Sequence, residues 1–205
     1  MKKFFKKKTI SALTLGLLAL GGYASGVLAA GYILLPWVWD KPYYEYYIQS
    51  DFGATSKQQL VESAGTWNSA VNNEWVASRH IVDTLDKTYT KNGKNTITKS
   101  NMGDDGIPAR VKYQDYWKDS NQIYHIKEAD MHFNIYYPWA NSKQVGKFFI
   151  KDVATHEFGH IFLLDEVHSP YTDRSMYQDV NYNEDFRVTL HSDDIAGAKA
   201  SVARW

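Results

Sequence analysis

The residues best suited to chemistry are His156, Glu157 and His160, which form the sequence His-Glu-Phe-Gly-His. On a helix, imidazoles four residues apart lie on one face and can bind one tetrahedral Zn²⁺ at about 2.0–2.1 Å. Glu157 would face the open side of that ion, where a carboxylate can accept a proton from zinc-bound water. Two core histidines are the alternative, but their buried nitrogens would need partners that a metal supplies. The spacing therefore predicts a hydrolytic zinc site.

The elements that must position this motif have recognisable patterns. Side chains that recur every three or four residues predict a helix from about Ser142 to Leu164: Phe149, Val153, His156, His160. Before it, strict alternation predicts a strand from Ile123 to Tyr137, with an apolar side made of Ala129, Met131, Phe133 and Ile135. Pro138 cannot donate a ladder hydrogen bond, so we expect this strand to end there as an edge strand.

Local patterns predict the remaining elements, with no repeat and no linker between them. In chain order they are a first strand at Tyr43–Ile48, a helix at Ser56–Val71 with Ser56 as its N-cap, a polar loop or hairpin at Thr88–Gly106, and a final helix from about Ser192 or Asp193. We therefore expect one domain over residues 30–205.

Five pieces of sequence occur in the order that one known family has. They are Ala64-x-x-Trp67, the strand Ile126–Asn134 with its Glu-Ala-Asp-Met-His-Phe-Asn run, Val153-Ala154-Thr155 before the histidine motif, Ser175-Met176-Tyr177, and Leu190–Gly197. In these pieces the chain resembles the metzincin metallopeptidases, most closely the matrixins. The resemblance implies an α+β fold with a twisted, mostly parallel sheet, an antiparallel edge strand, an active-site helix, a C-terminal helix and a Met-turn at Met176.

The third zinc ligand departs from the family pattern, which has glycine at position 163 and a ligand at position 166. Here these residues are Leu163 and Glu166, and a leucine in the left-handed turn would be strained. A gapless alignment makes Glu166 the ligand. If the turn moves to Asp165, which tolerates positive φ better, His168 becomes the ligand, and we favour His168 for its imidazole. Glu184 is a third alternative, at the spacing of a gluzincin ligand.

The N-terminus has the features of an export signal. Lys2–Lys8 is basic, and Ile10–Ala30 is uncharged and mostly apolar. The small-x-small character of Val27-Leu28-Ala29 suits signal-peptidase cleavage before Ala30, with Leu28-Ala29-Ala30 as a weaker alternative. We predict a signal peptide over residues 1–29 and a secreted or cell-surface domain. The alternative is an uncleaved anchor, because ~20 apolar residues can span a bilayer.

Composition excludes several classes of protein. The 205 residues include no cysteine, which excludes disulfides, cysteine zinc ligands and thiol nucleophiles. The first 29 residues hold five lysines and no acid, so the rest carries 23 acidic against 18 basic residues. A net-acidic domain argues against nucleic-acid binding. Asp104-Asp105-Gly106 could hold Ca²⁺, but it lacks spaced oxygen ligands and is better explained as a polar turn.

Two hypotheses from different classes follow. The first is an exported, monomeric zinc endopeptidase whose peptide or protein substrate lies along the strand near Phe133–Tyr137. Membrane association is expected only if the N-terminal segment stays uncleaved. The second is a catalytically impaired metzincin-like domain that binds a cell-surface or protein partner. Glu157 argues against the second, because a purely structural zinc needs no general base.

Overall fold

The computed structural model describes residues 31–72, 75–77 and 90–204. In these residues the helices are α1 (Ala54–Val71), α2 (Ile150–Ile161) and α3 (Ser192–Val202), with a 3-10 turn at Phe186–Val188. The strands are β1 (Ile33–Leu34), β2 (Trp37–Trp39), β3 (Tyr44–Glu45), β4 (Tyr47–Ile48), β5 (Val76–Ala77), β6 (Thr96–Ser100), β7 (Ala109–Lys118), β8 (Tyr124–Asn134), β9 (Trp139–Ala140), β10 (Phe148–Phe149) and β11 (Leu164–Asp165).

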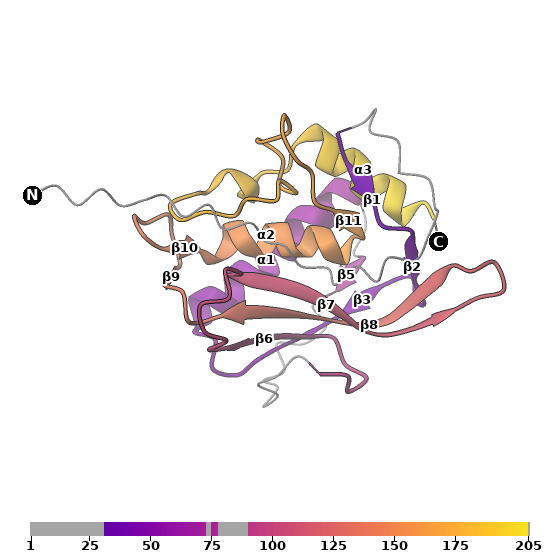
Figure 1. Cartoon of the computed structure of the whole chain (residues 1–205), viewed down its shortest axis with the longest axis horizontal. Helices are drawn as coiled ribbons and strands as arrows, with labels where there is room; N and C mark the ends of the chain where they lie inside the picture. The colour runs from indigo at the N-terminus through magenta and orange to yellow at the C-terminus, as the bar shows by residue number, and fades with distance from the viewer. Residues whose placement is uncertain (1–30, 73–74, 78–89, 205) are drawn as a thin grey trace, which may run out of the picture.

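The main sheet is built around β8. This strand pairs in parallel with β6 and with β2, and it pairs antiparallel with β7. β4 extends the sheet by pairing in parallel with β6. Among the described strands β7 pairs only with β8, so β7 is the antiparallel edge strand. The predicted α+β fold, with a mostly parallel sheet and one antiparallel edge strand, is confirmed (Figure 1).

The position of β8 corrects one prediction. The strand expected over Ile123–Tyr137 is present, but it lies inside the sheet and not at its edge. Its alternating polar side chains are buried rather than solvated, because neighbouring backbone and hydroxyl groups bond to them. Glu128 accepts two backbone N–H groups, and Asp130 accepts the hydroxyl of Thr96 at 2.8 Å. The edge belongs to β7, which was not among the predicted elements.

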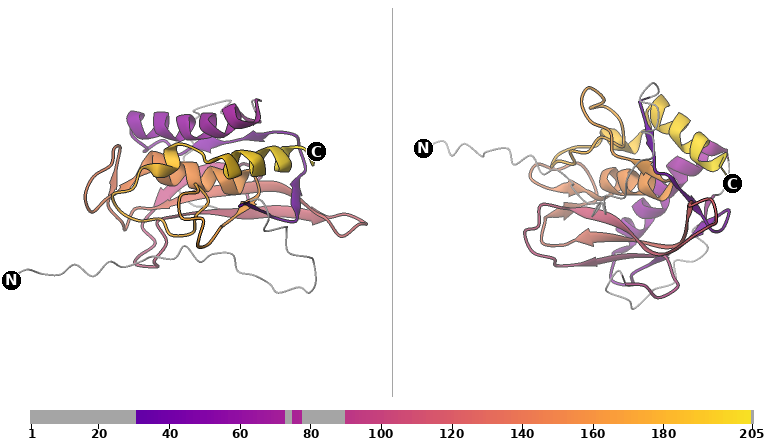
Figure 2. Two further views of the ribbon diagram at one scale, coloured as in Figure 1. Left: turned by 90° about the horizontal axis from the view of Figure 1, so that it is seen from above. Right: turned by 45° about the vertical axis from the view of Figure 1, so that its right-hand side comes forward.

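The helices lie together on one side of the sheet. The views in Figures 1 and 2 show α1, α2 and α3 stacked beside one another there, and α1 packs against both of the others. The inner face of α1 carries buried side chains at helical spacing, with Leu60, Ala64 and Trp67 among them. The indole N–H of Trp67 donates to the carbonyl of Thr155 at 2.8 Å. This bond fixes α1 against the helix that carries the histidine motif.

Element boundaries differ from the predictions at several places. Gly53 rather than Ser56 is the N-cap of α1, whereas α3 begins at Ser192 as predicted, with His191 as its N-cap. The polar stretch 88–106 contains β6, because Thr96, Ile97 and Thr98 suit a buried strand despite their polar neighbours. α2 is shorter than expected, since β10 pairs with β9 immediately before it.

The predicted export segment and residues 88–89 lie outside the described residues. Within the described parts of the chain, each helix is too short or too polar to cross a bilayer.

Candidate metal centre

Helix α2 brings His156 and His160 together, one turn apart. Their ring centroids are 5.0 Å apart, and their planes are at 90°. Nδ1 of His156 bonds to the carbonyl of Ser175 at 2.7 Å, and Nδ1 of His160 bonds to the carbonyl of Leu164 at 2.9 Å. A neutral ring that donates from Nδ1 keeps the Nε2 lone pair free for a metal. Burial lowers the pKa of both imidazoles, which favours this neutral form.

The chain turns back directly after α2, at Leu163. This residue is fully buried and has φ 57°, in the left-handed region, which costs an L-residue about 1–2 kcal/mol. Its N–H donates to the carbonyl of His160 and its carbonyl accepts the N–H of Leu35, both at 2.8 Å. The turn therefore stays where the family pattern has glycine. The alternative bend at Asp165 is not formed, because Asp165 pairs with Ile33 in an antiparallel ladder.

Glu166, and not His168, reaches the histidine pair. The ligand atoms of His156, His160 and Glu166 all lie within 4.8 Å of one another. No other group of three or more His, Asp or Glu side chains converges in this way in the part of the chain that the structure describes. His168 is exposed, two residues further on. The geometry thus favours the carboxylate over the imidazole that the sequence analysis preferred.

Glu157 stands beside this group as the candidate general base. Its side chain is 3% exposed, and its Oε2 atom has no hydrogen-bond partner in the structure. Burial and the nearby Glu166 carboxylate together raise the pKa of Glu157 to about 8, although Arg110, Arg187 and the backbone N–H of Val111 on β7 lower it. A carboxyl group with a pKa near the working pH can both accept and return a proton.

The side chains fit a bound zinc ion. Nε2 of His156 is buried without a hydrogen-bond partner, a state that is costly unless a metal or another polar group completes it. Two imidazoles and one carboxylate are an established donor set for catalytic zinc. Burial, with Asp165 and Asp179 nearby, raises the pKa of Glu166 to about 8. A cation at this place would relieve the repulsion that these carboxylates exert on one another.

A buried methionine packs against α2 where the Met-turn was predicted. Met176 is 1% exposed, and it fits because Gly159 has no side chain: a Cβ atom there would overlap the Met176 sulfur. The N–H of Val167 donates to the carbonyl of Met176 at 2.8 Å, and the carbonyl of Ser175 orients His156. The methionine turn therefore holds both a histidine ring and the chain just beyond the third ligand candidate.

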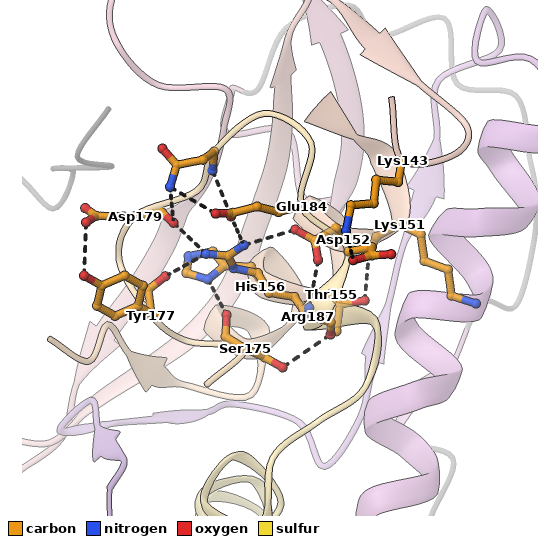
Figure 3. A network of polar contacts seen from close by, with 12 residues as sticks. Lys143, Lys151, Asp152, Thr155, His156, Ser175, Tyr177, Asp179, Glu184 and Arg187 are labelled. Atoms are coloured by element: carbon orange, nitrogen blue, oxygen red, sulfur yellow. Dashed lines mark hydrogen bonds and ion pairs between the residues drawn. The ribbon is translucent and has the colours of Figure 1, made fainter. Parts of the chain in front are cut away.

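A buried arginine connects this turn to α2, and sequence reasoning did not find it. Arg187 is 0% exposed, pairs with Asp152 at 3.1 Å and Glu184 at 2.7 Å, and donates to the carbonyl of Asp179 at 2.6 Å. Figure 3 shows these contacts beside His156. A signal was present: Asp152 lies four residues before His156, on the same helix face, and a buried carboxylate requires a partner.

The other candidate residues have structural partners. Glu184, the rival ligand, pairs with Arg187. Apart from the exposed His168, the histidines outside the motif that the structure describes are bonded to neighbouring groups: His125 to Asp119, His132 to Thr98 and Ser100, and His191 to the start of α3. His80 lies outside the described residues. In the possible Ca²⁺ loop, Asp105 pairs with Arg110.

Comparison with known proteins agrees with this arrangement. The matrixin family model matches residues 118–201. That stretch runs from the end of β7 through β8, α2 and the methionine turn into α3, and it excludes α1. No curated protein matches the chain.

Proposed function

Because the matrixin family model matches residues 118–201, we propose that the chain is a matrixin-like metzincin and acts as an exported zinc-dependent endopeptidase. One observation carries the proposal: ligand atoms of His156, His160 and Glu166 converge, and the buried Glu157 beside them has a free carboxylate oxygen. A structural zinc site would have no use for that oxygen. We assign a third-ligand role to Glu166 in place of His168.

In the proposed reaction the metal would activate the carbonyl and the water, and protein side chains would hold the metal and transfer the proton. When bound, Zn²⁺ would polarise the scissile carbonyl and lower the pKa of water. His156 and His160 would hold the ion through Nε2, with their Nδ1 atoms fixed by backbone carbonyls. Glu157 would accept the proton of the attacking water and deliver it to the leaving nitrogen. Burial raises the pKa of Glu157 in the absence of the ion, and a bound cation would lower it again and favour the carboxylate form that accepts the proton.

The substrate would lie along β7. This strand contacts the helix that carries the general base, and the backbone N–H of Val111 lies close enough to lower the pKa of Glu157. The Tyr113 hydroxyl donates to the carbonyl of His160 at 2.7 Å, which ties β7 to the end of α2. An extended peptide can add to an open strand edge through main-chain hydrogen bonds. This place replaces Phe133–Tyr137, since β8 is paired on both sides.

Export and monomeric state are part of the proposal. The basic and apolar segment over residues 1–29 supports secretion with cleavage near Ala29. The protein or peptide substrate would then be met outside the cytoplasmic membrane. The alternative of an impaired binding domain has no observation in its favour.

Glu157→Gln tests the mechanism. The amide keeps the size of the side chain but cannot accept the proton, so peptidase activity on casein should fall at least ~10²-fold while zinc content is unchanged. Glu62→Gln, on the exposed side of α1, is the matched control and should be fully active. A chelator should abolish the wild-type activity, and added Zn²⁺ should restore it. Glu157→Gln activity within threefold of wild type would overturn the assignment.

A further inference from the structure

The N-terminal strand β1 is paired with the segment that connects the metal ligands. Ile33 pairs with Asp165 and Leu34 pairs with Leu164 in an antiparallel ladder. The next residue, Leu35, donates its N–H to the carbonyl of Leu163 at 2.8 Å. β1 also contacts helix α3, and Figure 1 shows β1, β11 and α3 at the same end of the molecule. Residues about 130 positions apart are therefore joined by backbone bonds beside the candidate metal centre.

β11, the strand that pairs with β1, is linked to two of the three candidate ligands. The carbonyl of Leu164 accepts the Nδ1–H of His160 at 2.9 Å, so the position of β11 sets the orientation of that imidazole. Glu166 follows β11 directly. The residue after Glu166 is also fixed, because the N–H of Val167 donates to the carbonyl of Met176. A shift of β11 would therefore move His160 and Glu166 together, while His156, held by Ser175, would keep its place.

β11 alone could not hold this position, because it follows the left-handed turn at Leu163. The Leu35 N–H bonds the carbonyl of that turn, and the Leu35 carbonyl in turn accepts the guanidinium of Arg204 at 2.7 Å. Both backbone groups of Leu35 are thus used. Leu35 links the end of the C-terminal helix to the strained turn.

Helix α3 packs against both β1 and β11. Gly197 leaves no room for a side chain: a Cβ atom there would lie 2.7 Å from Leu164 and 2.9 Å from Tyr32. The backbone of α3 at Gly197 is therefore packed directly against Leu164 of β11 and Tyr32, the residue before β1. By contrast, a Cβ atom on Gly65 of α1 would meet nothing within 4 Å.

We propose that β1 and Leu35 form a positioning strand for the metal centre, which fixes β11 and thereby aligns His160 and Glu166 on one ion. The proposal rests on the proposed zinc site, and it adds that residues 32–35, remote in sequence from every ligand, set the affinity for the metal. Leu35 is a positioning residue, since it touches neither metal nor substrate.

Leu35→Pro and Leu35→Ala in the otherwise unchanged chain test the proposal. Both variants lose the leucine side chain, but only proline also removes the N–H that bonds Leu163. The zinc dissociation constant is measured by chelator competition at one pH, and the visible spectrum of the Co²⁺ form reports the ligand set. Leu35→Pro should bind zinc at least ~10-fold more weakly than Leu35→Ala, the size of change typical of groups that orient ligands. A smaller ratio would overturn the proposal.

A second pair of variants decides if Leu35→Pro does not fold. Gly197→Ala should weaken zinc binding about 10-fold, because the new methyl group displaces Leu164, while Gly65→Ala should bind as the wild type does. Equal affinity in the two alanine variants would overturn the role of β11. A wild-type chain that binds no zinc would instead overturn the proposed function, so the two failures are distinguishable.

Discussion

At the scale of residues, two of the three candidate ligands follow from side-chain type and spacing, and the third does not. His156 and His160 lie on one helix face in any α-helix, so five residues of local sequence place them. Glu166 comes into reach only because Leu163 adopts a positive φ. Nothing local favours that conformation for a leucine. The preference for His168 failed to anticipate this turn because the contact with Leu35 that stabilises it lies elsewhere in the chain.

The third ligand is tested by Glu166→Ala and His168→Ala. Loss of a direct ligand should cost more than the ~10–100-fold in affinity typical of a group that only orients ligands. We expect Glu166→Ala to weaken zinc binding by more than ~100-fold. His168→Ala should stay within about threefold of wild type, because that side chain is exposed and away from the ligand group. Chelator competition at one pH measures both constants. The reverse order would return the role to His168.

At the scale of elements, α2 and the methionine turn are fitted to each other through a glycine. Gly159→Ala would place a methyl group against the Met176 sulfur and 2.9 Å from Trp67. Such overpacking should lower the free energy of unfolding by ~1–3 kcal/mol. Gly65→Ala, in the open part of α1, should instead raise it by up to ~1 kcal/mol, because alanine favours a helix. Urea unfolding of both variants gives the comparison, and equal stability would refute the close fit.

An element could be predicted from the sequence where the spacing of its apolar residues matches the face that it buries. α1, α2 and β8 were found because their apolar periodicity reflects one buried face. The place of β8 was missed, since its polar side is buried and satisfied by β6 and nearby loops. β7 was not predicted, although Ala109–Gln114 alternates apolar and polar side chains; the alternation ends where the register with β8 shifts, after Tyr113. Such a short pattern does not indicate which strand it pairs with.

At the scale of the whole molecule, the buried side chains on the two faces of the sheet differ in polarity. The side toward the helices is aromatic and aliphatic, with Trp67, Phe158 and Phe162 at its centre. The other side of β8 is polar and also buried, so its titratable groups couple the free energy of unfolding to pH. Burial raises the pKa of Asp130 to about 6. Burial, with a smaller effect of the Arg110 charge, lowers the pKa of His132 to about 4. These two groups act in opposite directions.

His132 provides the test of this coupling. Its ring bonds Thr98 at 2.7 Å and Ser100 at 3.0 Å and is 1% exposed. In the unfolded chain an ordinary histidine takes up a proton near pH 6.5, whereas folded His132 resists until about pH 4. Protons therefore favour the unfolded state between these values, so the stability that neutral His132 provides is present above pH 6.5 and is lost as the pH falls toward 4.

Wild type and His132→Gln should therefore respond differently to acid. With chelator present, the free energy of unfolding of the wild type should fall by about 2 kcal/mol more between pH 7 and pH 5 than that of His132→Gln, since one pKa unit corresponds to ~1.4 kcal/mol. Asp130, His156 and His160 titrate in both proteins, so the difference isolates His132. Urea unfolding at the two pH values measures it. Parallel losses in the two proteins would mean that His132 accepts its proton in the folded state as easily as in the unfolded chain.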